Sequence, residues 1–248
     1  MKHPLSLYRS QRGAALLILF MLILLVGSAI LLKGLSGKKP GAQQREASLA
    51  QLAEAKEALI GFAMATGRLP CPADPVIATG AANAGLERPA CTLAADRTGV
   101  LPWVTLGIGE TDAWGRRFSY SVTPAFADNP STTATFIPPA TCIPAPNPTQ
   151  SSFALCSDGD ITILDTAGGA TMADKIPALI LSHGKNGFNA VLGTGVQISP
   201  STDADENENN MGNANFVSKT ISETFDDVVV WIELQKLKDM MQKAQKLP

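Results

Sequence analysis

An uncharged apolar run near the amino terminus constrains this chain more than any other feature. It covers residues 14–32 (AALLILFMLILLVGSAILL), nineteen positions without a charged side chain. As an α-helix it would be about 28 Å long, close to the hydrocarbon thickness of a bilayer. A helix buried in a globular core would rarely lack a polar face over that length. The run therefore predicts a single membrane-spanning helix.

The charge of the chain limits its partners. The 248 residues carry 20 Lys and Arg against 22 Asp and Glu, a formal net charge of −2. Because binding to the phosphates of nucleic acid requires a basic surface, nucleic acid is not expected as a partner. The two histidines, His3 and His183, are too few for a multi-histidine metal site.

All four cysteines follow the apolar run: Cys71, Cys91, Cys142 and Cys156. They form no CxxC pair, and no histidine is near them in sequence, which disfavours zinc. Of three possible pairings, that of sequence neighbours would close short loops in proline-rich segments. The alternative is four reduced, buried thiols. Disulfides would place these residues in an oxidising space outside the cytoplasmic membrane, with the amino terminus inside.

The segment before the run is short and basic. Residues 1–13 carry three basic side chains and end in a glycine directly before Ala14. An ordinary secretory signal has a shorter apolar core and then a small-residue cleavage site, for which residues 27–29 offer only a weak match. Residues 12–17 (RGAALL) instead resemble the leader of the prepilin family.

In that family a membrane peptidase cuts after the glycine. The resemblance implies cleavage between Gly13 and Ala14, often followed by methylation of the new amino terminus. Most members carry glutamate at the fifth mature position, where this chain has Ile18. That glutamate is thought to pair with a neighbour's terminal amine in the filament, and subunits that lack it tend to be minor or tip subunits.

Hydropathy patterns after the run predict an α+β domain. Apolar stripes predict a helix over about residues 43–65 and a terminal helix over about residues 233–246. Strands are predicted from alternating, β-branched or aromatic residues at 116–122, 160–165, 176–182 and 227–232. This order predicts a second helix packed on an antiparallel sheet of about four strands, plus a C-terminal helix.

A distinctive motif enters the first predicted strand at residues 111–120 (TDAWGRRFSY). Asp112 could cap the turn, Gly115 permits a tight backbone, and the aromatic residues give the strand a packing surface. The motif resembles the D-x-W-G-x-x-aromatic-x-aromatic sequence of type II secretion pseudopilins. Other matching stretches are LPCP at 69–72, LPW at 101–103, LILSHGKNG at 179–187, FDDVVVW at 225–231 and LP at 247–248.

An acidic run, residues 203–210 (DADENENN), precedes the last of these stretches. Calcium takes six to eight oxygen ligands, and the candidates here are Asp205, Glu206, Asn207, Asn209, Asp226 and Asp227. By resemblance to the calcium site of the major pseudopilin, Asp226 or Asp227 would be the ligand at the strand end. The spacing is not that of an EF-hand. A structural Ca²⁺ is the expected cofactor, and a solvated acidic loop is the alternative.

The resemblance implies a pseudopilin-like, minor subunit of a type II secretion or type IV pilus-like filament. It would be a single-pass protein of the bacterial inner membrane, with residues 33–248 forming a periplasmic, pilin-like α+β domain. Its partners would be the membrane, other pilin-like subunits, the assembly platform and the prepilin peptidase. The alternatives are a substrate- or surface-binding module that uses the Pro/Thr-rich residues 124–151, or a single-span envelope protein that keeps residues 1–13.

Catalysis is not expected. Ser182 and His183 are adjacent in sequence, and neighbours on a strand point to opposite faces, so adjacency does not indicate a catalytic pair. The chain also contains no G-x-S-x-G sequence and no phosphate-binding loop.

Overall fold

A computed structural model describes residues 17–24, 40–91, 96–127, 150–210 and 212–248. The chain divides into two compact units, Met1–Gln43 and Gln44–Pro248. The expected leader, its cleavage site at Gly13 and Ala14, and most of the expected membrane helix lie outside the described residues. The membrane span therefore stays a prediction.

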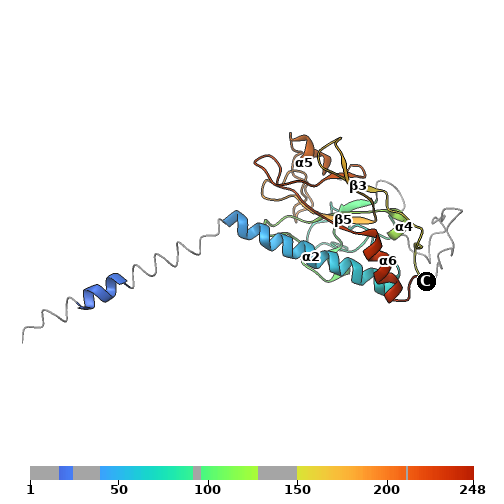
Figure 1. Cartoon of the computed structure of the whole chain (residues 1–248), viewed down its shortest axis with the longest axis horizontal. Coiled ribbons are helices and arrows are strands. Elements are labelled where there is room, and N and C mark those ends of the chain that lie inside the picture. Colours follow the sequence, from blue (N-terminus) through green and yellow to red (C-terminus); the bar gives the residue numbers. More distant parts are fainter. Residues whose placement is uncertain (1–16, 25–39, 92–95, 128–149, 211) are drawn as a thin grey trace, which may run out of the picture. The chain divides into compact units, whose positions relative to one another are not determined.

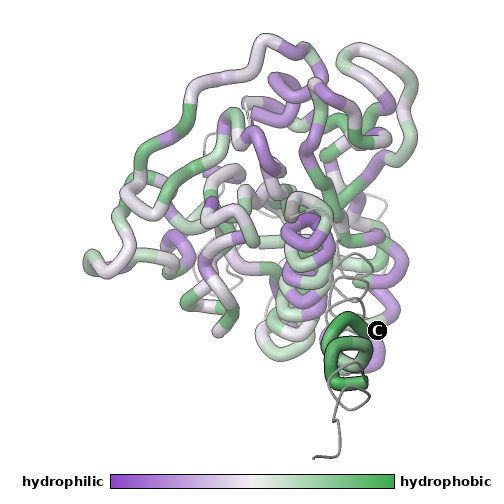
Figure 2. The backbone as a smooth tube through the Cα atoms, turned by 90° about the vertical axis from the view of Figure 1, so that its left-hand side faces the viewer, coloured by the Kyte–Doolittle hydropathy of each residue, from purple (hydrophilic) through white to green (hydrophobic). Residues whose placement is uncertain are grey.

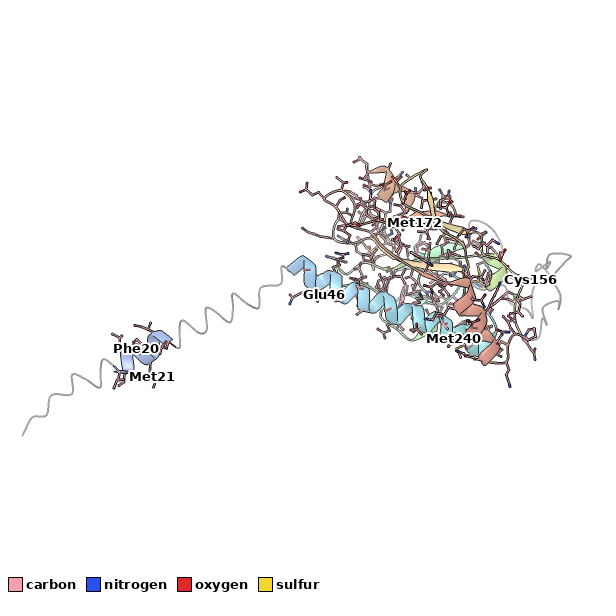
Figure 3. The ribbon with its side chains drawn as sticks, in the orientation of Figure 1. Phe20, Met21, Glu46, Cys156, Met172 and Met240 are labelled. Carbon is pink, nitrogen blue, oxygen red and sulfur yellow. A yellow bond between two sulfur atoms is a disulfide. The ribbon has the colours of Figure 1, made fainter. Side chains whose placement is uncertain are left out.

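Residues 17–24 form a helical segment of the first unit. Its eight side chains are all large, apolar and 54–67% exposed. Figure 2 shows the segment as uniformly hydrophobic, and Figure 3 shows Phe20 and Met21 projecting from it in different directions. Among the described residues, no helix combines the length and hydropathy that crossing a membrane requires.

The long helix α2 (Pro40–Thr66) agrees closely with the helix expected over residues 43–65. Its buried face consists of small and apolar residues that join the main core: Leu52, Ala55, Leu59, Ile60 and Ala63. The terminal helix α6 (Leu234–Lys243) lies beside it (Figure 1) and closes the same core with Leu237 and Met241. Two ion pairs join the helices, Lys56 with Glu233 and Glu57 with Lys236.

The main sheet has four antiparallel strands in the order β1 (Thr98–Val100), β2 (Ser119–Val122), β5 (Ala178–Ser182) and β7 (Val228–Ile232). Strands β2 and β5 are buried along their whole length because both faces of the sheet are covered. One face joins the α2 core, and the other joins a second apolar cluster. This confirms the expected helix on a four-stranded antiparallel sheet.

A second sheet covers the other face of the first. Its strands run in the order β4 (Thr171–Ile176), β3 (Ile161–Leu164) and β6 (Asn215–Val217), and the β3–β6 pair is parallel. The strand expected at residues 160–165 therefore forms, but in this sheet and not in the main one. Its Ile161 and Ile163 pack against Leu179 and Leu181 of β5. Short helices α3 (Trp103–Leu106), α4 (Pro124–Ala127) and α5 (Ala204–Glu208) complete the fold.

A disulfide joins Cys71 to Cys91, as the pairing of sequence neighbours predicts. Arg68, just before the loop that the disulfide closes, forms a bidentate ion pair with Glu87 inside it, and Glu87 also accepts a hydrogen bond from the Cys71 backbone N–H. Cys156 is disulfide-bonded as well. Its expected partner, Cys142, lies outside the described residues.

Candidate metal centre

Three segments meet at one end of the main sheet. The turn of residues 183–187 follows β5, and Asp226 and Asp227 directly precede β7. Because Ser182 of β5 pairs with Val228 of β7, the turn and the two aspartates are brought together. Helix α5 supplies the third segment, with Asp203 capping its first turn by accepting the N–H groups of Asp205 and Glu206. Most of the acidic run thus forms the short helix α5, which contacts the turn through Glu206 and Asn186.

Three carboxylates gather where these segments meet. Glu206, Asp226 and Asp227 each offer an oxygen atom, and these atoms lie within 4.8 Å of one another. Glu206 is only 1% exposed and Asp227 only 4%. We call these three residues the carboxylate cluster.

Hydrogen bonds satisfy only part of the cluster. Asp226 Oδ2 accepts the backbone N–H groups of Lys185 and Asn186, both at 2.9 Å. Glu206 Oε1 accepts the Asp226 N–H at 3.1 Å and the side-chain amide of Asn186. Among the described residues, Glu206 Oε2 and Asp226 Oδ1 are buried without any hydrogen-bond partner. A buried, unpartnered carboxylate oxygen is costly, and a bound cation would remove that cost.

The electrostatics of the cluster also favour a cation. Burial raises the pKa of Asp226, and the nearby negative charges of Glu206 and Asp227 raise it further. An all-oxygen donor set suits a hard cation such as Ca²⁺ or Mg²⁺ and not zinc or copper. Calcium takes six to eight ligands, so backbone carbonyls or water would complete the shell around three carboxylates. The residues present could therefore hold a hard cation.

Two of the expected ligands have other partners. Asp205 accepts hydrogen bonds from the Thr166 hydroxyl and the Ala167 N–H, and it pairs with Lys219. Asn209 donates to Asp227 Oδ2 at 2.9 Å and binds both backbone groups of Val217. Asp205 thus ties α5 to the β3–β4 turn, and Asn209 orients Asp227 from the side of β6.

The sequence motif at 111–120 contacts β5 and the 183–187 turn, a connection that the sequence alone did not indicate. Asp112 Oδ1 accepts the N–H groups of Trp114 and Arg116, which confirms its expected role in the turn. Asp112 Oδ2 accepts the Ser182 hydroxyl at 2.6 Å. The side chain of Arg116 reaches the carbonyls of the 183–187 turn. The signal for this connection was present in the paired motifs DAWGRR and SHGKNG, but only the fold brings them together.

A serine, a histidine and an aspartate also line up beside the cluster. Ser119 Oγ lies 2.9 Å from His183 Nε2, and His183 Nδ1 lies 3.6 Å from Asp227 Oδ1. The second distance is too long for a hydrogen bond. All three residues are at most 4% exposed, which keeps a substrate from the serine. The arrangement favours a packing role, in which the imidazole bridges β2 and the start of β7.

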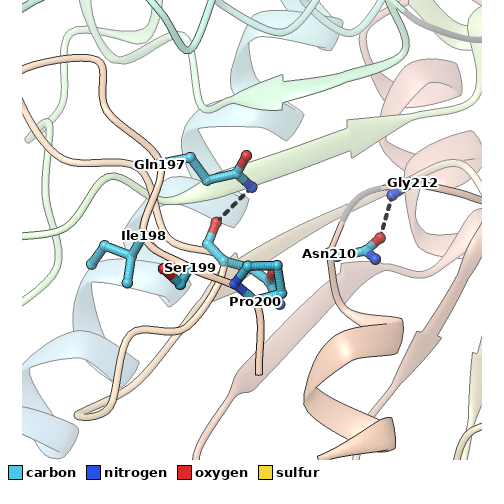
Figure 4. A pocket seen from close by; sticks show the side chains of 7 residues that line it. Gln197, Ile198, Ser199, Pro200, Asn210 and Gly212 are labelled. Atoms are coloured by element: carbon cyan, nitrogen blue, oxygen red, sulfur yellow. Dashed lines mark hydrogen bonds between the residues drawn. The ribbon is translucent and has the colours of Figure 1, made fainter. Parts of the chain in front are cut away.

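An open pocket of about 460 Å³ lies between residues 197–200 and the segment that follows the end of α5 (Figure 4). Its lining residues are uncharged: Asn189, Gln197, Ile198, Ser199, Pro200, Asn210 and Gly212. The side-chain amide of Asn189 donates to the Glu206 carbonyl at 3.3 Å, and the Asn189 carbonyl accepts from Gln197 at 3.1 Å. The lining thus helps to hold the backbone of Glu206.

Comparisons of the chain with protein-family models, with curated proteins and with solved structures gave no match.

Proposed function

We propose that this chain is a pseudopilin-like, minor subunit of a type II secretion or type IV pilus-like filament. One observation carries the proposal: the 27-residue helix α2 packs along a four-stranded antiparallel sheet and follows an apolar N-terminal run. The D-A-W-G turn that precedes β2 and the carboxylate cluster before β7 support it, because the pseudopilin resemblance expects such a turn before a strand of the sheet and acidic ligands at the start of the last strand.

The proposed role is mechanical. The apolar helix of residues 14–32 holds the subunit in the inner membrane and then packs against the helices of other subunits in the filament. A filament transmits force only through stiff subunits, and α2 is clamped to the domain by its buried apolar face and by its ion pairs to α6. Ile18 in place of the usual glutamate supports a minor or initiating position.

We also propose that the carboxylate cluster holds a structural Ca²⁺. The cation would neutralise Glu206, Asp226 and Asp227 and so join α5, the 183–187 turn and the start of β7. Without a cation, the three carboxylates would repel one another where these segments meet, and the charge of the cation would offset that repulsion.

The test of the filament role is the amino terminus of the membrane-extracted protein, measured by intact mass and peptide mass spectrometry. We expect a start at Ala14, with or without a methyl group, and Gly13→Val should block the cut. Gly27→Val is the matched control and should leave processing unchanged. An uncut Met1 would favour the single-span envelope protein, and a start beyond Ala29 would identify an ordinary signal peptide and refute the filament role.

A binding module on the same scaffold is the second prediction from sequence, and most of its segment lies outside the described residues. Deleting residues 128–149 separates the two roles. If the shortened chain still assembles filaments but these no longer bind the substrate or surface, the segment is a binding element. If filaments are lost, the segment belongs to assembly.

A further inference from the structure

The 183–187 turn is held from two opposite sides. On one side, Asp226 Oδ2 accepts the N–H groups of Lys185 and Asn186. On the other side, the guanidinium of Arg116 donates to the carbonyl of Gly184 and, at 3.0 Å, to that of Lys185. The peptide groups of the turn therefore point their N–H ends at a carboxylate and their C=O ends at a cation. Both charges favour the same orientation of the turn.

The contact between Arg116 and the turn leaves no free space. A Cβ at Gly187 would lie 2.1 Å from Nε of Arg116, so only glycine allows the guanidinium to approach this closely. Because Arg116 and Asp226 hold the same turn, the side chain of Arg116 contributes to where Asp226 places its unpartnered Oδ1.

The backbone of the same motif contacts α2. The N–H of Ala113 donates to Ser48 Oγ at 3.1 Å, and the side-chain amide of Gln51 donates to the Thr111 carbonyl at 3.2 Å. Ser48 is fully buried. Asp112 closes the turn of the motif and connects it to β5, because its carboxylate accepts the Arg116 N–H and the Ser182 hydroxyl. Residues 111–116 thus touch α2 at one end and the turn beside the carboxylate cluster at the other.

We propose that Arg116 is a positioning residue that couples cation occupancy of the carboxylate cluster to the seating of α2 at Ser48. The inference rests on the proposed cation site. A cation bound at the cluster restrains Asp226 and the turn, and local opening of everything hydrogen-bonded to that turn then becomes less frequent. Through residues 111–116 this protection reaches α2, the helix that would extend into the filament.

The test combines calcium titration calorimetry with amide hydrogen exchange on the full chain in a mild detergent. In the wild type, Ca²⁺ should slow exchange at residues 184–187 and 44–52, while α6 should not respond. Arg116→Gln should weaken Ca²⁺ binding by about tenfold, the lower end of the loss that follows when a group orienting a metal ligand is removed. At saturating Ca²⁺ the same variant should lose the response at residues 44–52. Arg116→Lys keeps the positive charge but not the forked geometry of the guanidinium. This variant should therefore keep only part of the exchange response at residues 44–52.

Arg97→Gln is the matched control, because Arg97 is also a bidentate arginine but pairs with Asp160. It should leave Ca²⁺ affinity and the α2 response unchanged. The double variant Ser48→Ala, Gln51→Ala removes both hydrogen bonds on the helix side. It should bind Ca²⁺ as the wild type does and lose the α2 response, which keeps the test decisive if Arg116→Gln does not fold.

The outcomes separate the two proposals. Ca²⁺ binding without protection of residues 44–52 in the wild type overturns the coupling and leaves the cation site standing. An undiminished response in Arg116→Gln or in the double variant Ser48→Ala, Gln51→Ala overturns it as well. Absence of Ca²⁺ binding to the wild type rejects the cation site and the coupling together.

Discussion

Gly184 and Asp226 approach each other so closely that no side chain fits between them. A Cβ at Gly184 would lie 2.3 Å from the Asp226 carbonyl oxygen and 2.5 Å from its Oδ1. Gly184 also has a φ of +57°, in the left-handed region that other residues adopt only with strain. Gly184, the first glycine of the SHGKNG turn, is therefore required by the position of a proposed metal ligand as well as by the backbone conformation.

Replacing this glycine should damage both the fold and the site. We expect Gly184→Ala to destabilise the domain by about 3 kcal/mol, because backbone strain adds to a clash that backbone atoms cannot relieve. Gly168→Ala is the matched control: its φ is +67°, but a Cβ there meets nothing within 4 Å. Strain alone should cost about 1 kcal/mol there. Urea unfolding of both variants gives the difference, and equal losses would show that the contact with Asp226 is unimportant.

Calcium should stabilise the protein through the carboxylate cluster. A ligand present at 100 times its dissociation constant adds about 2.7 kcal/mol to the free energy of unfolding. We expect Ca²⁺ added to chelator-treated protein to raise the unfolding temperature, and Glu206→Gln to abolish most of that rise. Thermal unfolding with and without Ca²⁺ measures both effects.

Glu208→Gln provides the control for that measurement. Glu208 lies on the same helix and carries the same charge, but its carboxylate accepts a hydrogen bond from Asn213. Its replacement should keep the Ca²⁺-dependent rise. If both variants respond to Ca²⁺ like the wild type, the cluster does not bind the cation.

Arg117 should be among the most sensitive positions of the fold. Its side chain is fully buried, pairs with Glu110 at 2.8 Å and stacks on the Trp103 ring at 4.7 Å. It also donates to the carbonyls of Pro75, Ile77 and Gly193. Arg117→Met leaves these acceptors without their donor, so we expect a loss of about 3–5 kcal/mol in urea unfolding.

The more exposed Arg88 is the comparison for Arg117. It donates to the carbonyls of Asp96 and Thr98, and 20% of its side chain is exposed. Water can replace part of these contacts, so Arg88→Met should cost about 1 kcal/mol. A loss as small as this for Arg117→Met would mean that the hydrogen bonds from Arg117 contribute little to stability.

Local patterns predicted the elements better than their assembly. Helices α2 and α6 follow from the helical spacing of their apolar residues, and strands β2, β3, β5 and β7 follow from alternating, β-branched or aromatic residues. Strand β4 is mostly polar and exposed, while β1 and β6 have three residues each, too few for a pattern. The sequence could not predict that β3 belongs to the second sheet, because its pattern of apolar residues suits a strand of either sheet.

The candidate site shows the same division. Glu206, Asp226 and Asp227 were found because acidic residues at a loop and a strand start suggest a cation. Which acids converge depends on how α5 is oriented, and composition carries no information on that orientation. Asp205 is one residue from Glu206, yet its carboxylate contacts the β3–β4 turn and Lys219 instead. The link from Arg116 to the turn needed the β2–β5 pairing, a contact between distant parts of the sequence.

The different partners of Asp205 predict a distinct dependence on pH. Burial alone would raise the pKa of Asp205, but hydrogen bonds from Ala167, Lys219 and Thr166 lower it from 3.8 to about 2. A carboxyl whose pKa is lower in the folded state contributes stability above its unfolded pKa. That contribution disappears as the pH falls through the folded value. We therefore expect the wild type to lose about 2 kcal/mol from this group between pH 4 and pH 2.

Two variants isolate this contribution. Asp205→Asn should lower the free energy of unfolding by about 2 kcal/mol at pH 7, with a smaller decline between pH 4 and pH 2 than in the wild type. Asp239→Asn removes an exposed carboxyl of α6 and should follow the wild-type curve. Urea unfolding across this pH range tests the assignment. A parallel decline in the Asp205→Asn variant would show that the contacts of Asp205 with Thr166, Ala167 and Lys219 do not stabilise its charged form.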